Sequence, residues 1–130
     1  MFGLALAATL VACSHAPAPS AVAALGERFP IRPGESVAIR GEPVTVEFQR
    51  ILSDNRCAID VVCIVGGEAR SAFRVTVGGA APVSVELSTD PRSTAEVGGY
   101  RIALVAMTPA PRSTVRIAPQ DYRAELVVSR

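Results

Sequence analysis

The chain is poor in the side chains that carry most catalysis and most recognition of bases and sugars. It has no Trp, 5% aromatic residues and a single histidine, His15. So few aromatic rings predict no stacking platform for nucleic-acid bases or carbohydrates. A Ser-His-Asp arrangement requires an imidazole fixed in place, and His15 lies in a Pro/Ala-rich stretch that we expect to be a flexible tether. The sequence therefore predicts no catalytic residues of this type.

The chain also lacks an excess of charge of either sign. The formal net charge is +1, and the 13 basic residues are all Arg, scattered singly along the chain. A protein without an extended basic field is not expected to bind nucleic acid, so no nucleic-acid partner is predicted. Several arginines fall on the polar positions of expected strands, where solvated surface is the simpler interpretation and an anion-binding patch is the alternative; they are Arg70, Arg74, Arg101 and Arg123.

Residues 1–12 form an apolar run interrupted only by Thr9, and Cys13 follows it directly. The run is too short to span a bilayer as a helix, which takes about 20 residues. Leu10-Val11-Ala12-Cys13, followed by a stretch rich in Pro, Ala and Ser, resembles the lipobox of bacterial lipoproteins. The resemblance implies a signal peptide over 1–12, lipidation of Cys13 and a tether over 13–27, with the folded domain at 28–130. A secretory signal that is simply cleaved is the alternative.

The same resemblance implies a location. A lipoprotein belongs to the bacterial cell envelope and contacts the membrane through its lipid anchor. Ser14, rather than an aspartate, follows the cysteine, and by the same resemblance this favours the outer membrane of a diderm bacterium. Several acyl chains on one cysteine would make the anchoring stable.

Apolar and polar residues alternate with a period of two over most of the chain after residue 35, a pattern typical of half-buried strands. We predict about seven strands, at 35–40, 43–52, 61–65, 68–77, 82–88, 99–108 and 121–129, with a short eighth at 115–117. Gly78-Gly79 separates two strongly alternating runs and predicts a hairpin of 68–77 with 82–88. Residues 88–98 are expected to form a polar loop. The fold class is therefore all-β: a single antiparallel sandwich or small barrel.

The three cysteines leave one unpaired in an exported chain. If Cys13 carries lipid, Cys57 and Cys63 remain, and we expect them to form a disulfide. They are six positions apart, wider than the usual reactive pair, and thiol redox chemistry is the less favoured alternative. Zinc requires four ligands, and only two cysteines remain. Copper(I) could bind the two cysteines together with Met107, but Met107 is more simply interpreted as a core residue. No metal and no cofactor are predicted.

The segment Asp54–Ala69 resembles a motif of an uncharacterised family of small exported bacterial lipoproteins: Asp-Ser-Arg-Cys-Pro, a short spacer, then Val-x-Cys-Val-Trp-Ala-Gly-Glu-Ala. The residues that match in order and spacing are Asp54, Arg56, Cys57, Cys63, Gly67, Glu68 and Ala69. The chain departs from the motif at Ala58, Val65 and Gly66, and loss of the Trp removes an aromatic binding surface there. The resemblance implies a lipoprotein β domain and no known activity.

The charged residues of this segment allow two interpretations. Asp54 suits an Asx-type turn, and Arg56 could form a bidentate ion pair with Asp54, Asp60 or Glu68. These residues would then brace a loop beside the disulfide; alternatively, they form a recognition loop over Ser53–Gly67 that contacts an envelope protein. We favour a non-catalytic binding or structural domain. The alternative is an envelope thiol-redox or hydrolytic enzyme built on Cys57, Cys63 and the neighbouring acids.

Overall fold

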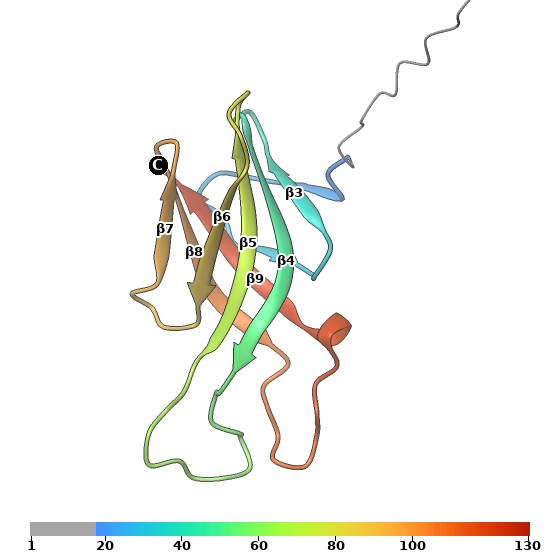
Figure 1. Ribbon diagram of the computed structural model, residues 1–130, viewed down its shortest axis with the longest axis vertical. Coiled ribbons are helices and arrows are strands. Elements are labelled where there is room, and N and C mark those ends of the chain that lie inside the picture. The colour runs from blue at the N-terminus through green and yellow to red at the C-terminus, as the bar shows by residue number, and fades with distance from the viewer. Residues whose placement is uncertain (1–17) are drawn as a thin grey trace, which may run out of the picture.

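Two β-sheets pack face to face in the computed structural model of the protein, which describes residues 18–130 (Figure 1). One sheet has five strands in the order β1-β3-β4-β5-β6, and the other has four in the order β2-β9-β8-β7. The strands are β1 (Ala21–Ala23), β2 (Phe29–Ile31), β3 (Ser36–Ile39), β4 (Val44–Asp54), β5 (Ala69–Val77), β6 (Val83–Ser88), β7 (Thr94–Val97), β8 (Tyr100–Thr108) and β9 (Arg123–Ser129). The predicted all-β sandwich is confirmed, and the two sheets do not close into a barrel.

The core lies between the sheets and comes from the inward positions of the alternating strands. Phe48 of β4 and Phe73 of β5 pair directly across the sheet, are fully buried, and have ring centroids 4.7 Å apart. Ile102 of β8 and Leu126 of β9 are among the fully buried residues that the second sheet contributes to the same core. The period-two pattern thus identified the faces correctly.

The hairpin predicted around Gly78-Gly79 is confirmed, because β5 and β6 pair antiparallel from Arg70↔Ser88 to Val75↔Val83. Gly78 has a φ of 57°, which a tight turn needs and a side chain disfavours. Most of the predicted strands also exist, with bounds within a few residues of those expected.

Three sequence predictions are wrong. Residues 61–65 are not a strand but part of a loop. Residues 88–98 are not entirely a loop, because β7 lies within them and pairs with β8. Residues 115–117 form no strand, and Val115 makes a single isolated bridge with Arg112. Short segments of this kind take their conformation from pairing and packing in the folded protein, which alternation alone does not reveal.

The boundary of the domain also differs from the expectation. Residues 13–27 were assigned to a tether, but Ala21–Ala23 form β1, which pairs parallel with β3. The sandwich is therefore antiparallel with one parallel pair, and β2, at residues 29–31, was missed as well. The expected signal peptide and Cys13 lie outside the described residues. None of the helices in the described part of the chain is long and apolar enough to cross a membrane.

Candidate functional site

Two long loops lie together at one end of the sandwich, which we call the loop end (Figure 1, bottom). They connect β4 to β5 (residues 55–68) and β8 to β9 (residues 109–122). The backbone N–H of Ile59 donates to the carbonyl oxygen of Pro111 at 2.9 Å, so the loops are hydrogen-bonded to each other. The described chain begins at the opposite end of the long axis, near β1.

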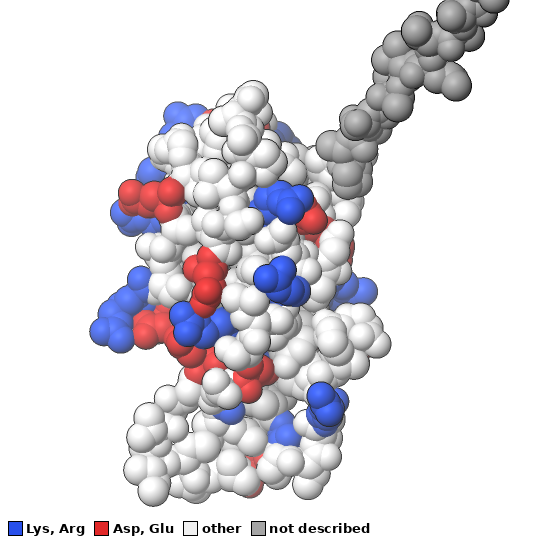
Figure 2. Space-filling view, in the orientation of Figure 1, with Lys and Arg blue, Asp and Glu red and all other residues white. Residues whose placement is uncertain are grey.

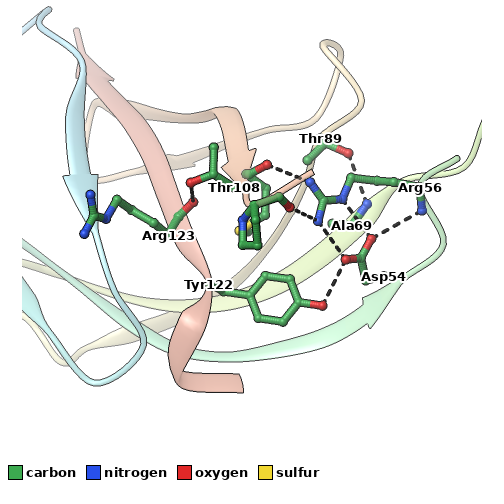
Figure 3. Close-up of polar contacts among 9 residues, drawn as sticks. Asp54, Arg56, Ala69, Thr89, Thr108, Tyr122 and Arg123 are labelled. Atoms are coloured by element: carbon green, nitrogen blue, oxygen red, sulfur yellow. Dashed lines mark hydrogen bonds and ion pairs between the residues drawn. The ribbon is translucent and has the colours of Figure 1, made fainter. Parts of the chain in front are cut away.

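At the base of these loops, Asp54 and Arg56 form a two-pronged ion pair (Figure 3). The Nε of Arg56 donates to Oδ1 of Asp54 at 2.8 Å, and its second guanidinium nitrogen donates to Oδ2 at 2.7 Å. The backbone N–H of Arg56 also approaches Oδ1 at 3.3 Å, which completes the predicted Asx-type turn. Parallel N–H donors matched to a carboxylate make this the strongest geometry available to an ion pair.

The same pair reaches across to the other sheet. Arg56 donates to the carbonyl oxygen of Met107 at 2.6 Å and to that of Pro109 at 3.0 Å, while the hydroxyl of Tyr122 donates to Asp54 at 2.9 Å. The side chains of Asp54 and Arg56 are 11% and 12% exposed. We call Asp54, Arg56 and Tyr122 the clamp, because their contacts tie the end of β4 to the ends of β8 and β9.

Irregular pairing along β4 turns Arg50 outward and still leaves Asp54 facing inward, toward the clamp. Unbroken alternation after Phe48 would turn Arg50 and Leu52 toward the interior. Register shifts follow Phe48 and Ile51, and such β-bulges add one residue and reverse the side that follows. Phe48, Ile51 and Asp54 therefore pair with inward residues of β5, while Arg50 and Leu52 remain exposed. The first bulge keeps Arg50 out of the core, and the second restores the original alternation, so that Asp54 still faces inward.

The clamp shifts the acid–base behaviour of its members. Arg56 lowers the pKa of the Asp54 carboxyl, with a further contribution from the Tyr122 hydroxyl, against the opposing effect of burial. Burial, followed by the hydrogen bond to Asp54, raises the pKa of Tyr122. Asp54 is thus a carboxylate and Tyr122 a neutral donor at neutral pH, which is the pair of states that the hydrogen bonds require.

We expect the clamp to weaken in acid. A carboxyl whose pKa is lower in the folded state stabilises the fold above its unfolded pKa, about 4, and loses that contribution as the pH falls through the folded value. Asp54→Asn should therefore reduce the free energy of unfolding by a constant amount at and above about pH 5, and the difference from the parent should shrink toward about pH 2. Urea unfolding at a series of pH values measures it, and a difference independent of pH would contradict the assignment.

The other two charged candidates also contact the protein itself. Asp60 accepts hydrogen bonds from Ser113, from its backbone N–H at 2.9 Å and from its hydroxyl at 2.5 Å, and these bonds lower the pKa of Asp60. Glu68 accepts a hydrogen bond from the Ser88 hydroxyl at 2.7 Å. Of the three partners considered for Arg56, the structure selects Asp54. Each of the three acids thus binds a different partner, and the described residues contain no group of three or more His, Cys, Asp and Glu that could hold a metal ion.

Cys57 and Cys63 are joined by a disulfide, as predicted, with Cα atoms 6.0 Å apart. The bridge closes a short loop rather than pinning a strand, since no strand begins at Val61. Beyond the bridge, Gly67 passes so close to the chain that a Cβ atom there would lie 1.6 Å from the carbonyl oxygen of Asn55. The disulfide and this close approach fix the two ends of the loop.

The feature that sequence analysis missed is the exposed part of this loop. We call residues 61–65 the apolar tip. The side chains of Val62, Ile64 and Val65 are 99%, 103% and 80% exposed. The stretch from Val61 to Gly67 contains no charged residue, and the loop end is largely uncharged in Figure 2. The apolar run was visible in the sequence, but it predicted a strand. Cys63 lies within the run and is paired with Cys57, and this pairing is the signal that could have indicated a loop.

Neither a scan against models of known protein families nor searches among curated proteins and solved structures found a match. The resemblance of Asp54–Ala69 to a lipoprotein motif therefore stays a prediction. The clamp gives that motif a physical meaning in this chain, because Asp54 and Arg56, two of its matching residues, bind each other.

Proposed function

We propose that the protein is a non-catalytic lipoprotein of the bacterial cell envelope that uses the apolar tip to bind another envelope protein. The observation that carries the proposal is the exposure of Val62, Ile64 and Val65 on one short loop. Complete burial of an aliphatic side chain of this size is favourable by about 1.5–3 kcal/mol. Adjacent apolar residues left in solvent are typical of interaction sites.

Rigid presentation of the tip supports a binding role. The disulfide closes the loop, the clamp holds its base, and the hydrogen bonds of Ile59 and Asp60 attach it to the neighbouring loop. A loop that is already ordered loses little conformational entropy when it binds. The charged residues of the motif then serve to hold the loop, while its aliphatic residues make the contact.

The proposed lipid anchor is compatible with this orientation. The described chain begins at the end of the sandwich opposite the loop end (Figure 1). A domain tethered through Cys13 could therefore direct the tip away from its point of attachment. The contacts of Asp54, Asp60 and Glu68 inside the protein support a binding role over the hydrolytic alternative.

The proposal is tested with the triple variant Val62→Ser, Ile64→Ser and Val65→Ser. Because these side chains are exposed, the melting temperature should change little, whereas capture of the partner by chemical crosslinking in intact cells should fall on the order of tenfold or more, as expected when binding hot spots are truncated. Captured proteins are identified and quantified by mass spectrometry.

Two valines at a distance from the tip provide the matched control. Val83 of β6 and Val105 of β8 are each 44% exposed, and a Val83→Ser/Val105→Ser variant should retain the partner. If the tip variant captures the partner as well as the parent does, the assignment of the tip is contradicted. If all variants, and a strain lacking the protein, give the same set of captured proteins, the binding role itself is contradicted.

A further inference from the structure

A cavity of about 590 Å³ lies beside the loop end and is not used by the proposed function. It is bounded by the second half of β4 and by the segment that precedes β9, with Ile51, Val115 and Ile117 among its walls. Pro33, before β3, and Pro111 and Pro119, both in the segment that precedes β9, complete an aliphatic lining. Its volume is in the range of cavities that hold a small organic ligand, about 300–1,000 Å³.

The charges around the cavity favour an anion. Arg50 and Arg116 line it, and neither forms an ion pair within the described part of the chain. The one carboxylate in the lining, Asp54, already binds Arg56 and Tyr122. Two positive charges therefore remain uncompensated at an apolar cavity, an arrangement complementary to a ligand with an apolar body and a negative group.

Other ligand classes fit the lining less well. Tyr122 is the one aromatic residue in it, and its hydroxyl is held by Asp54, so a nucleotide base or sugar would have little to stack on. Gln49 is the single neutral amide side chain of the lining, which leaves few groups to hydrogen-bond an extended peptide backbone. Aliphatic walls form no hydrogen bonds with a ligand, and a hydrocarbon chain needs none.

We propose that this cavity binds a single-chain anionic amphiphile, with the hydrocarbon chain against Ile51 and Ile117 and a carboxylate paired with Arg50 and Arg116. Binding is reversible and involves no covalent step. The site is separate from the apolar tip, so the proposal stands or falls independently of the envelope partner.

Titration calorimetry with sodium decanoate, kept below its micelle concentration, tests the proposal on the purified protein. The Arg50→Ala/Arg116→Ala variant should bind decanoate about tenfold more weakly, since each partly exposed charge pair contributes severalfold. Arg40→Ala is the matched control: it removes an exposed arginine that also lacks an ion pair in the described structure but does not line the cavity. It should bind like the parent.

Two further measurements separate the cavity from general attraction of an anion. Val115→Trp, at a residue that is 57% exposed, should block the cavity and weaken decanoate binding without removing a charge. The neutral probe 1-decanol should bind the parent about tenfold more weakly than decanoate does. The proposal is overturned if decanoate does not bind, if the arginine or tryptophan variants bind as the parent does, or if 1-decanol binds equally well.

Discussion

Replacing Arg56 with alanine is expected to lower the free energy of unfolding by about 3 kcal/mol, because it leaves the carboxylate of Asp54 without its partner in a place almost closed to water. The substitution also removes the donors to the carbonyl oxygens of Met107 and Pro109. The carbonyl oxygen of Met107 is partly buried, so the loss of its donor adds to the cost. Urea unfolding measures the loss, and calorimetry should show a lower melting temperature.

The chain contains a matched control for this experiment. Asp90 and Arg92 have the same spacing as Asp54 and Arg56 and the same two-pronged pattern, with Nε at 3.2 Å from Oδ1 and a second nitrogen at 3.0 Å from Oδ2. The side chain of Arg92, however, is 91% exposed. Arg92→Ala should cost no more than about 0.5 kcal/mol. Equal losses from the two variants would contradict the claim that the clamp acts through burial and its contacts with the second sheet.

Replacing Gly67 with alanine is the second large effect, and we expect it to cost about 3 kcal/mol, the upper part of the range for inserting an atom where none fits. The added Cβ would lie 1.6 Å from the carbonyl oxygen of Asn55. Because that atom is backbone, no side-chain rotation relieves the contact. The strands leaving the loop must separate, and the hydrogen bond from the Asn55 N–H to the Glu68 carbonyl, at 2.9 Å, should be lost.

The neighbouring glycine supplies the control. A Cβ at Gly66 has no atom within 4 Å, and its φ is not in the positive region, so Gly66→Ala should be neutral or slightly stabilising. Chemical denaturation compares the two variants, and amide hydrogen exchange at Asn55 tests the local opening. If Gly67→Ala is as stable as Gly66→Ala, the close approach does not constrain the loop.

The sequence was most informative where the residue pattern of one segment is enough to show which of its side chains are buried. Val44, Val46 and Phe48 alternate with polar residues, and all three are buried in β4 as expected. The hairpin at Gly78 was predictable for a similar reason, since the turn residues and both strands are adjacent in the chain. The Asx-type turn at Asp54 is equally local.

Features that depend on distant partners could not be predicted. The contacts of Arg56 with Met107 and Pro109 join residues more than 50 positions apart. Ala21–Ala23 form a strand because they pair with β3, not because three small residues prefer to be extended. The apolar run at 61–65 was predicted to be a strand, but the disulfide holds it in a loop and its side chains are exposed.

The roles of the residues in the candidate site therefore differ from those predicted from the sequence. Asp54 and Arg56 were candidates for a recognition loop, yet both are turned inward and hold the loop end together. The residues available to a partner are aliphatic ones that were predicted to form a strand. Substitutions in the clamp should thus act through stability, and substitutions in the tip should act through binding.

The most direct test of this account is site-specific photo-crosslinking in intact cells. A photoreactive amino acid is placed at Val62 in the tip, and, in a separate protein, at Val105 on the outer face of β8, 44% exposed. The account predicts a discrete crosslinked product with an envelope protein from position 62 and none with that protein from position 105. A product formed from position 105 and absent from position 62 would contradict it.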